Sequence, residues 1–290
     1  GGTSTVAAKA TRVRARIVAQ TINEQMQASD KVFIMGHANE DYDAIGSAIG
    51  MAKLSLSLNK ETYIVVSGRN ENVNRISEML ASESMKVTGH EEDYNSIMVE
   101  EEEALKHITP DSLLVLVDHH REILTASKAV LEAISKRIIV DHHRRAEDLI
   151  GDTVLLYLEP SSSSTSELLT ELVGYFNDRL EITPAEATAL YSGIVLDTKN
   201  FAVQTGERTF EAAALLRRSG ADPNMVRLMF KGDMDVLKLR ARLIAEAKTI
   251  EPGIAIALYK RAEKGAKATI LAAQVADTLI NIEGIHVGVA

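Results

Sequence analysis

The sequence predicts an α/β protein with a doubly wound, mainly parallel sheet, followed by a second, smaller α/β domain. Two observations lead to this fold class. Short apolar runs alternate with helical segments through the first half of the chain, which is typical of a parallel sheet covered by helices on both faces. In addition, 46% of the 290 residues are hydrophobic and 25% are charged, as in folded globular chains of this length.

The first half of the chain contains the predicted sheet. It opens with an amphipathic leader helix, followed at 31–36 by a short apolar run of the kind that forms a buried parallel strand. In the next helix, Gly46 and Gly50 allow close packing on the sheet. Further strands are predicted at 62–66, 113–117, 137–140 and 153–158. Further helices are predicted at 71–81 and 123–135, and the acidic stretch 91–103 is interpreted as a solvated helix.

The second half of the chain is mainly helical. Ser164 with Glu167 and Thr183 with Glu186 have the spacing of capping boxes, and another helix is expected to begin at Pro223. The pattern returns to strand, helix and strand near the end. The predicted divisions are a leader helix at 1–30, a first domain at 31–232, a connecting helix at 233–249 and a partial second domain at 250–290.

The chain contains no cysteine. This excludes disulfides, thiolate catalysis, and zinc or iron–sulfur sites with sulfur ligands. Any metal must therefore be held by His, Asp and Glu, which favours harder ions such as Mn²⁺, Mg²⁺ or Fe²⁺. The absence of cysteine also agrees with a reducing cytoplasm.

The charge and the aromatic content argue against binding of long nucleic acids. The formal net charge is −9, whereas binding to duplexes depends on Lys and Arg that neutralise phosphates. With 7 Tyr, 5 Phe and no Trp, a stacking platform for single strands is also disfavoured. Small nucleotides remain compatible with the sequence, because they need only a local pocket.

The two ends of the sequence predict a fragment of a longer protein. The chain begins at Gly1 without an initiator Met and ends at Ala290 in an apparent strand. No apolar run approaches the roughly 18 residues that a membrane span requires, so no membrane contact is predicted within this stretch. The sequence leaves the oligomeric state open, a homodimer included.

Acidic and histidine side chains follow the predicted strands, at the points where these strands end. Because the carboxyl ends of parallel strands share one edge of a sheet, we expect these side chains to lie close together. A single Asp after a strand is more often a turn former or a helix cap, so the prediction depends on the coincidence of several such positions. The candidate metal ligands are His37, Asp41, Asp43, Asp118, His142 and Asp197.

Two imidazoles and four carboxylates are enough for two divalent ions about 4 Å apart, provided that one carboxylate bridges them. Mixed imidazole and carboxylate ligands without sulfur suit Mn²⁺ better than a structural zinc. Such a pair of ions can ionise a bridging water at neutral pH and can neutralise charge on a phosphoryl centre.

The chain contains two Asp-His-His triplets, at 118–120 and 141–143. The second is followed by Arg144 and Arg145, a pair suited to phosphate binding. The first triplet is interpreted as needing only its Asp for chemistry, which leaves His119 and His120 with structural or supporting roles.

These motifs resemble those of the DHH–DHHA1 phosphoesterase superfamily, and most closely those of the GdpP family of cyclic di-AMP phosphodiesterases. The resemblance extends from about Val32 to Asp222 and implies that the first domain is a DHH domain. It also implies that 250–290 is a truncated, DHHA1-like substrate-binding domain. The segments that carry the resemblance are 33–47, 139–145, 162–167, 186–190 and 197–201.

The resemblance also implies a role for each candidate residue. It implies one Mn²⁺ held by His37, Asp41 and Asp118, and a second held by Asp43, Asp118, His142 and Asp197. The catalytic residues are implied to be His143, which faces the substrate phosphate, and Asp141, which orients its neighbours. Substrate-binding residues are then His143, Arg144 and Arg145.

The sequence departs from the family pattern in two places. Relatives carry a smaller residue where His119 stands, so His119 either intrudes on the site or supplies an additional ligand. The Gly-rich, His-containing motif that ends the family's second domain is absent, and this predicts weak substrate binding.

The implied function is metal-dependent hydrolysis of cyclic di-AMP to pApA by water activated by two Mn²⁺, with Mg²⁺ or Fe²⁺ as alternatives. Two other functions stay open. One is an oligoribonuclease of the same superfamily with phosphatase activity on pAp, and the other is a module that binds a cyclic dinucleotide without hydrolysis. The resemblance further implies bacterial signalling, a cytoplasmic catalytic region and a membrane-anchored parent chain.

Overall fold

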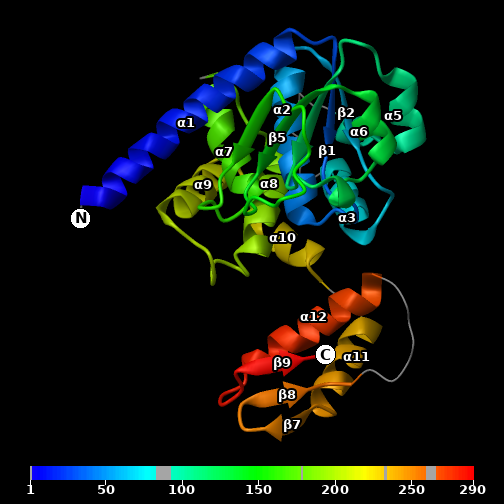
Figure 1. Cartoon of the computed structure of the whole chain (residues 1–290), viewed down its shortest axis with the longest axis vertical. Coiled ribbons are helices and arrows are strands. Elements are labelled where there is room, and N and C mark those ends of the chain that lie inside the picture. The colour runs from blue at the N-terminus through cyan, green and yellow to red at the C-terminus, as the bar shows by residue number, and fades with distance from the viewer. Residues whose placement is uncertain (1, 83–92, 178, 232–233, 259–265) are drawn as a thin grey trace. The chain divides into compact units, whose positions relative to one another are not determined.

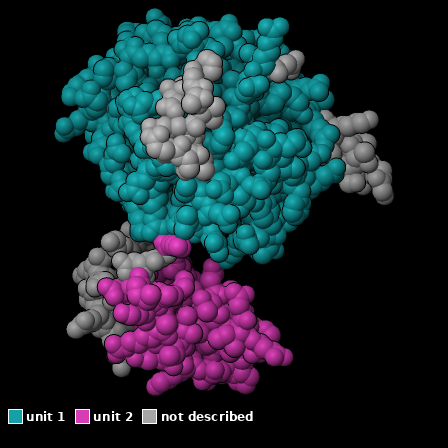
Figure 2. Space-filling model, turned by 180° about the vertical axis from the view of Figure 1, so that it is seen from behind, with its two compact units in different colours: residues 1–229 teal, residues 230–290 magenta. Residues whose placement is uncertain are grey.

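The computed structural model of the chain describes residues 2–82, 93–177, 179–231, 234–258 and 266–290. The chain forms two compact units, Gly1–Met229 and Phe230–Ala290, which Figure 2 shows in teal and magenta. Within the described ranges, no helix combines the length and the apolar content that crossing a membrane requires.

A six-stranded parallel sheet forms the centre of the first unit (Figure 1). Its order is β3-β2-β1-β4-β5-β6, so the direction of strand addition reverses between β1 and β4. In open α/β sheets, ligands bind beside the carboxyl ends of the strands at such a reversal. The predicted α/β fold with a mainly parallel sheet is therefore confirmed. The strands are β1 Lys31–Met35, β2 Glu61–Val65, β3 Met98–Val99, β4 Leu113–Val117, β5 Lys136–Asp141 and β6 Leu155–Leu158.

The central strands are apolar because helices cover both faces of the sheet. All five residues of β4 are buried. On one face, α5 (Glu101–His107) and α6 (Lys128–Ala133) contribute Ala104, Val130 and Leu131 to a core that includes Phe33 and Leu116. On the other face, α2 (Tyr42–Ser57) packs against β1 and β4, and α7 (Thr165–Phe176) packs against β5.

A further layer of helices covers α2 and α7. The tightest contact joins α2 to α8 (Pro184–Asp197), where a Cβ added to Gly46 would lie 2.4 Å from the carbonyl oxygen of Ala189. Only glycine permits this approach. The capping box of Thr183 and Glu186 is confirmed at the start of α8. The remaining helices of this unit are α1 Gly2–Gln27, α3 Glu71–Ala81, α4 Tyr94–Ile97, α9 Glu207–Arg218 and α10 Pro223–Met229.

Two predicted helices are wrong in extent. Within 91–103, Met98 and Val99 pair with β2 as the edge strand β3, so the acidic stretch does not form one helix; residues 91–92 lie outside the described ranges. The predicted helix at 123–135 is instead a short 3₁₀ turn, Glu122–Leu124, followed by α6 from Lys128. The chain between them is held extended because the amide of Ala126 donates to the carbonyl of Gly36.

The described residues of the second unit form a three-stranded sheet and two helices. In the sheet order β7-β8-β9, β7 and β8 are antiparallel and β8 and β9 are parallel. The helix predicted as a connection begins at Met234 and packs on α12 around Leu243, Val275 and Leu279 within this unit. The elements are α11 Met234–Ala245, β7 Lys248–Glu251, β8 Ile254–Ile256, α12 Ala266–Ile280 and β9 Val287–Val289.

Candidate metal centre

The structure brings all six predicted ligands together at the carboxyl edge of the sheet, where the strand order reverses. His37 and Asp41 lie in the β1–α2 loop, Asp43 lies in the first turn of α2, and Asp118 follows β4. His142 follows β5. The expectation that Asp197 follows a strand is wrong, because Asp197 is the last residue of the helix α8. Their ligand atoms form two groups, each with all members within 4.8 Å of one another: His37, Asp41 and Asp118, and Asp43, His142 and Asp197. A further group of this kind, Asp118, His142 and His143, includes a histidine that was not among the predicted ligands.

The β1–α2 loop presents its ligands through local hydrogen bonds. Asp41 is the N-cap of α2, and its Oδ1 accepts hydrogen bonds from the amides of Asp43 and Ala44 at 3.0 and 2.9 Å. The Nδ1 of His37 donates to the carbonyl of Ala38 at 2.9 Å. This bond fixes the ring of His37, and its Nε2 lies 3.4 Å from Oδ2 of Asp118.

Asp43, in the first turn of α2, is fully buried and faces the N-terminus of α7. Its two carboxylate oxygens accept hydrogen bonds from the amides of Thr165 and Ser166 at 2.7 and 2.8 Å. These are among the amides that a helix N-terminus leaves without partners, and they favour a negative charge. Gly193 lies directly against this arrangement, because an added Cβ would be 2.7 Å from Oδ1 of Asp43.

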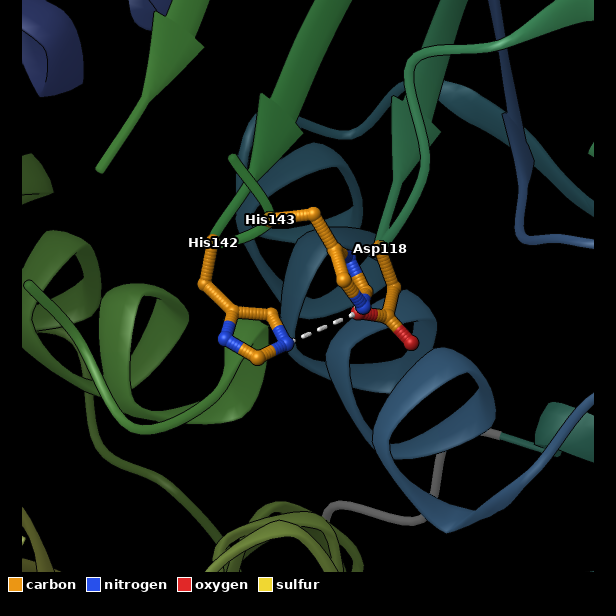
Figure 3. A group of neighbouring side chains, drawn as sticks. All are labelled: Asp118, His142 and His143. Carbon is orange, nitrogen blue, oxygen red and sulfur yellow. Dashed lines mark ion pairs between the residues drawn. The ribbon is translucent and has the colours of Figure 1, made fainter. Parts of the chain in front are cut away.

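Asp118 lies between the two ligand groups. Its Oδ2 faces His37, while its Oδ1 lies 3.6 Å from Nε2 of His142 and accepts a hydrogen bond from the hydroxyl of Thr165 at 3.1 Å. Figure 3 shows the rings of His142 and His143 turned toward this carboxylate. Asp118 adopts a left-handed backbone conformation with φ of 62°, which is uncommon for a residue other than glycine. Strain of this kind occurs often at functional sites.

His142 completes the second group. Its Nε2 lies 3.1 Å from Oδ2 of Asp197 and 3.9 Å from Oδ2 of Asp43. In the described part of the chain, this buried nitrogen has no hydrogen-bond partner. A buried imidazole nitrogen that faces three carboxylates without a bond to any of them fits a divalent cation, and the oxygen-rich ligand set fits a hard or borderline one.

Asp141 does not belong to either ligand group. Its Oδ1 accepts a hydrogen bond from Nδ1 of His143 at 2.7 Å, and its Oδ2 accepts one from Nδ1 of His120 at 2.5 Å. The Nε2 of His120 accepts the amide hydrogen of Ala146 at 2.9 Å, so His120 is neutral with its proton on Nδ1. The Asp141 carboxylate therefore holds two imidazoles in fixed orientations. The sequence predicted a structural or supporting role for His120 but did not identify Asp141 as its partner.

The crowding of carboxylates shifts the pKa values of the site. Burial lowers the pKa of His37, but Asp118 and Asp41 outweigh this effect and raise it to about 11. Burial, together with the charges of Asp118 and Asp197, raises the pKa of Asp43 well above its usual value. These shifts show an excess of negative charge that a divalent cation would neutralise.

The residues predicted to face substrate differ in exposure. The hydrogen bond to Asp141 raises the pKa of His143 to about 9, and 54% of the His143 side chain is exposed. Arg144 and Arg145 are exposed and form no ion pair within the described part of the chain. Their side chains are therefore available to an anionic ligand.

His119 is buried, with 1% of its surface exposed. Its Nδ1 lies 3.0 Å from the carbonyl of Val117, and it belongs to none of the ligand groups found among the described residues. Burial lowers the pKa of His119 to about 4, so the ring is neutral at physiological pH. Its Nε2, like that of His142, is buried without a hydrogen-bond partner among the described residues, so the two roles considered for His119, intrusion and additional ligation, stay predictions.

Comparisons with known proteins agree with this geometry. The family model described as the DHH family, N-terminal domain, matches residues 31–194. The chain is 39% identical to the cyclic-di-AMP phosphodiesterase PdeA of Listeria monocytogenes over 99% of its own length and 42% of that protein. It is 41% identical to the cyclic-di-AMP phosphodiesterase GdpP of Geobacillus thermodenitrificans, over 98% of its own length and 42% of the relative.

The chain thus spans less than half the length of the curated relatives it matches. Among solved structures, it is similar to an exopolyphosphatase-related protein from Bacteroides fragilis, with a TM-score of 0.71 and 19% identity. That match covers 92% of this chain and 77% of the other, and it shows that the two share a fold. On the strength of the match at 31–194, the chain belongs to the DHH family.

Proposed function

We propose that the chain is the hydrolytic region of a metal-dependent phosphodiesterase that converts cyclic di-AMP to pApA. The observation that carries this proposal is the position of Asp118, whose two carboxylate oxygens face separate groups of ligands. A bridging carboxylate of this kind is the feature that distinguishes a two-metal centre from a single site.

The proposed cofactors are two Mn²⁺ ions. One would be held by His37, Asp41 and Asp118, and the other by Asp43, Asp118, His142 and Asp197. When bound, such ions supply Lewis-acid activation of water and neutralisation of charge at phosphorus. The unpartnered Nε2 of His142 and the surplus of buried carboxylate support this assignment, which leaves Mg²⁺ and Fe²⁺ as alternatives.

The remaining residues of the site bind and orient the phosphodiester. Asp141 accepts a hydrogen bond from Nδ1 of His143. The Nε2 edge of this half-exposed side chain is therefore left for a phosphoryl oxygen. As charge develops on that oxygen in the transition state, a hydrogen bond from His143 becomes stronger. Arg144 and Arg145 lie next in sequence and can bind the second phosphate of a dinucleotide.

The substrate is proposed from the relatives. Both curated relatives are named as phosphodiesterases of cyclic di-AMP, and both match along nearly the whole of this chain. Such a substrate is compact and doubly charged, so it needs a local cationic pocket rather than a basic face. This agrees with a chain of net charge −9. A cytoplasmic location and a homodimer stay predictions.

Hydrolysis assays with Mn²⁺ test the proposal by comparing cyclic di-AMP, cyclic di-GMP and pApA. We expect cyclic di-AMP to be consumed fastest, with pApA as the product, and no turnover after removal of divalent ions. Faster consumption of pApA would favour an oligoribonuclease with pAp phosphatase activity. Tight binding of cyclic di-AMP without any product, at saturating Mn²⁺, would favour a module that only binds the nucleotide.

A further inference from the structure

Glu40 lies between two of the metal-ligand candidates, His37 and Asp41, yet it belongs to neither ligand group. Only 1% of its surface is exposed. Buried carboxylates are costly unless hydrogen bonds or a cation compensate for the loss of water. In the described part of the chain, Glu40 forms no ion pair with Lys or Arg, so hydrogen bonds must carry this compensation.

The donors come from the loop that joins β2 to α3. The amide of Ser67 donates to Oε1 of Glu40 at 2.5 Å, and the hydroxyl of Ser67 donates to Oε2 at 2.9 Å. The side-chain amide of Asn70 also donates to Oε2, at 3.2 Å. Because Asn70 is itself the N-cap of α3, this donor is held in place by a helix.

The backbone around Glu40 is tied to the same loop. Its carbonyl oxygen accepts hydrogen bonds from the side-chain amides of Asn70 and Asn72, each at 3.0 Å. The amide of Asn39 donates to the hydroxyl of Ser67 at 3.1 Å. Asn39 has a φ of 57°, so the chain turns sharply just before Glu40. These bonds fix the turn on which the spacing of His37 and Asp41 depends.

We propose that Glu40 is a positioning residue that holds His37 and Asp41 at the separation required for metal binding. The inference rests on the proposed metal centre, but it does not depend on which phosphodiester is the substrate. It predicts that loss of the Glu40 bonds lowers the affinity for the ion at His37, Asp41 and Asp118. The affinity for the ion at His142 and Asp197 should fall less. In the second group, His142 and Asp197 lie at the ends of β5 and α8, and the carboxylate of Asp43 is held separately by the amides of Thr165 and Ser166 at the start of α7.

Glutamine cannot replace Glu40, although the two side chains have nearly the same shape. Every partner of the carboxylate in the described structure is arranged as a donor: the amide and hydroxyl of Ser67, and the amide of Asn70. A glutamine amide would place its own NH₂ group against one of these donors in either orientation. Glu40→Gln therefore loses at least one of these bonds and sets its NH₂ group against another donor, while it nearly preserves the volume of the side chain.

The test measures Mn²⁺ binding by isothermal titration calorimetry and by electron paramagnetic resonance of the bound ions. We expect Glu40→Gln to weaken the binding of one Mn²⁺ by a factor of roughly 10 to 100, the range typical of groups that orient metal ligands. The signal of a coupled Mn²⁺ pair should give way to that of a single bound ion.

Glu186→Gln is the matched control. Glu186 is also 1% exposed, and it also has several hydrogen-bonding and charged partners, among them Tyr94 and Lys53. It lies at the N-terminal end of α8, whereas the ligand of that helix, Asp197, lies at the other end. Its replacement should lower the melting temperature while leaving both Mn²⁺ affinities within about twofold of the parent.

Two milder variants guard against loss of folding in Glu40→Gln. Ser67→Ala and Asn72→Ala each remove hydrogen bonds to Glu40 from residues that are not fully buried. Each should lower the affinity for the same Mn²⁺ by several-fold, and the two substitutions combined should lower it further. Unchanged Mn²⁺ binding in folded Glu40→Gln, or in the combined variant, would overturn the inference. A parent protein that binds no divalent ion would overturn the proposed metal centre itself.

Discussion

The Nδ1 atom of His120 lies 2.5 Å from Oδ2 of Asp141, and this hydrogen bond joins the two Asp-His-His triplets of the chain. The amide of Ala146 fixes the proton of His120 on Nδ1, so His120 must be the donor. Asp141 accepts a second hydrogen bond from His143, at 2.7 Å. The two triplets are therefore parts of one structure, in which His120 supports the carboxylate that orients His143.

Replacing His120 with Ala should slow turnover without removing the metals. The change leaves Oδ2 of the buried Asp141 without its donor, which costs about 1–3 kcal/mol of stability and loosens the orientation of His143. We expect turnover of cyclic di-AMP at saturating Mn²⁺ to fall by roughly 10- to 100-fold. His120→Asn, whose side-chain NH₂ can take the place of Nδ1, should recover part of the loss. Equal activities of His120→Ala and the parent protein would exclude this role.

Asp118→Ala should abolish binding of both metals, because each proposed ion loses a ligand that the other shares. In the parent protein, Mn²⁺ at a hundredfold excess over its Kd should add about 2.7 kcal/mol to the free energy of unfolding. A gain of this size should raise the melting temperature by roughly 5 °C or more. Asp118→Ala should show no such rise at the same Mn²⁺ concentration. If metal analysis finds two ions in Asp118→Ala at the parent's affinity, Asp118 does not bridge them.

Gly193→Ala should disturb the metal centre by displacing Asp43. The added methyl group would lie 2.2 Å from the hydroxyl oxygen of Ser166 and 2.7 Å from Oδ1 of Asp43, so both must move. Overpacking of this kind costs about 1–3 kcal/mol, and here the movement also displaces a proposed ligand. We expect a lower melting temperature together with weaker Mn²⁺ binding.

Gly174→Ala is the control for this substitution. Gly174 also lies in a helix, α7, but an added Cβ there meets no atom within 4 Å. Its replacement should leave Mn²⁺ affinity unchanged and should stabilise the protein by up to about 1 kcal/mol. Equal Mn²⁺ affinities for Gly193→Ala and Gly174→Ala would show that Asp43 tolerates the displacement.

The positions of Asp118 and His142 could be predicted because they depend on a simple rule, whereas Asp197 ends the helix α8 and reaches the site through tertiary packing. Apolar runs such as 113–117 identify buried strands, and the polar residue that follows each strand lies at the shared edge of the sheet. The edge strand β3 could not be found in this way, because its two residues, Met98 and Val99, are too few to show a period. Its pairing with β2 decides its structure.

The supporting contacts of the site could not be predicted from the sequence. Glu40 and its donor Ser67 are 27 positions apart, and neither loop has a pattern that indicates the other. The same holds for Asp43 and the amide of Thr165, which are brought together by the packing of α2 on α7. The Ser-rich segment before α7 was recognisable as a helix cap, but its role in holding Asp43 depends on tertiary structure.

The last prediction tests whether His119, His142 and His143 have different roles in metal binding and turnover. His142 faces three carboxylates through Nε2, whereas His143 is held by Asp141 and is half-exposed. A lost metal ligand should reduce metal affinity, so His142→Ala should need at least 10- to 100-fold more Mn²⁺ for any activity. A lost phosphate contact should spare metal binding and lower kcat, because its contribution grows in the transition state.

His143→Ala should therefore bind Mn²⁺ normally and stay slow at every Mn²⁺ concentration. His119→Ala is the internal comparison, because His119 contacts the backbone of its own strand and lies outside both ligand groups. It should keep the Mn²⁺ requirement and kcat within a few-fold of the parent values. Mn²⁺ titrations of activity and of binding, run side by side on the three variants, separate these effects. If His119→Ala loses Mn²⁺ while His142→Ala retains it, then His119 rather than His142 is the ligand. The histidine ligand of the second metal would then come from the triplet at 118–120.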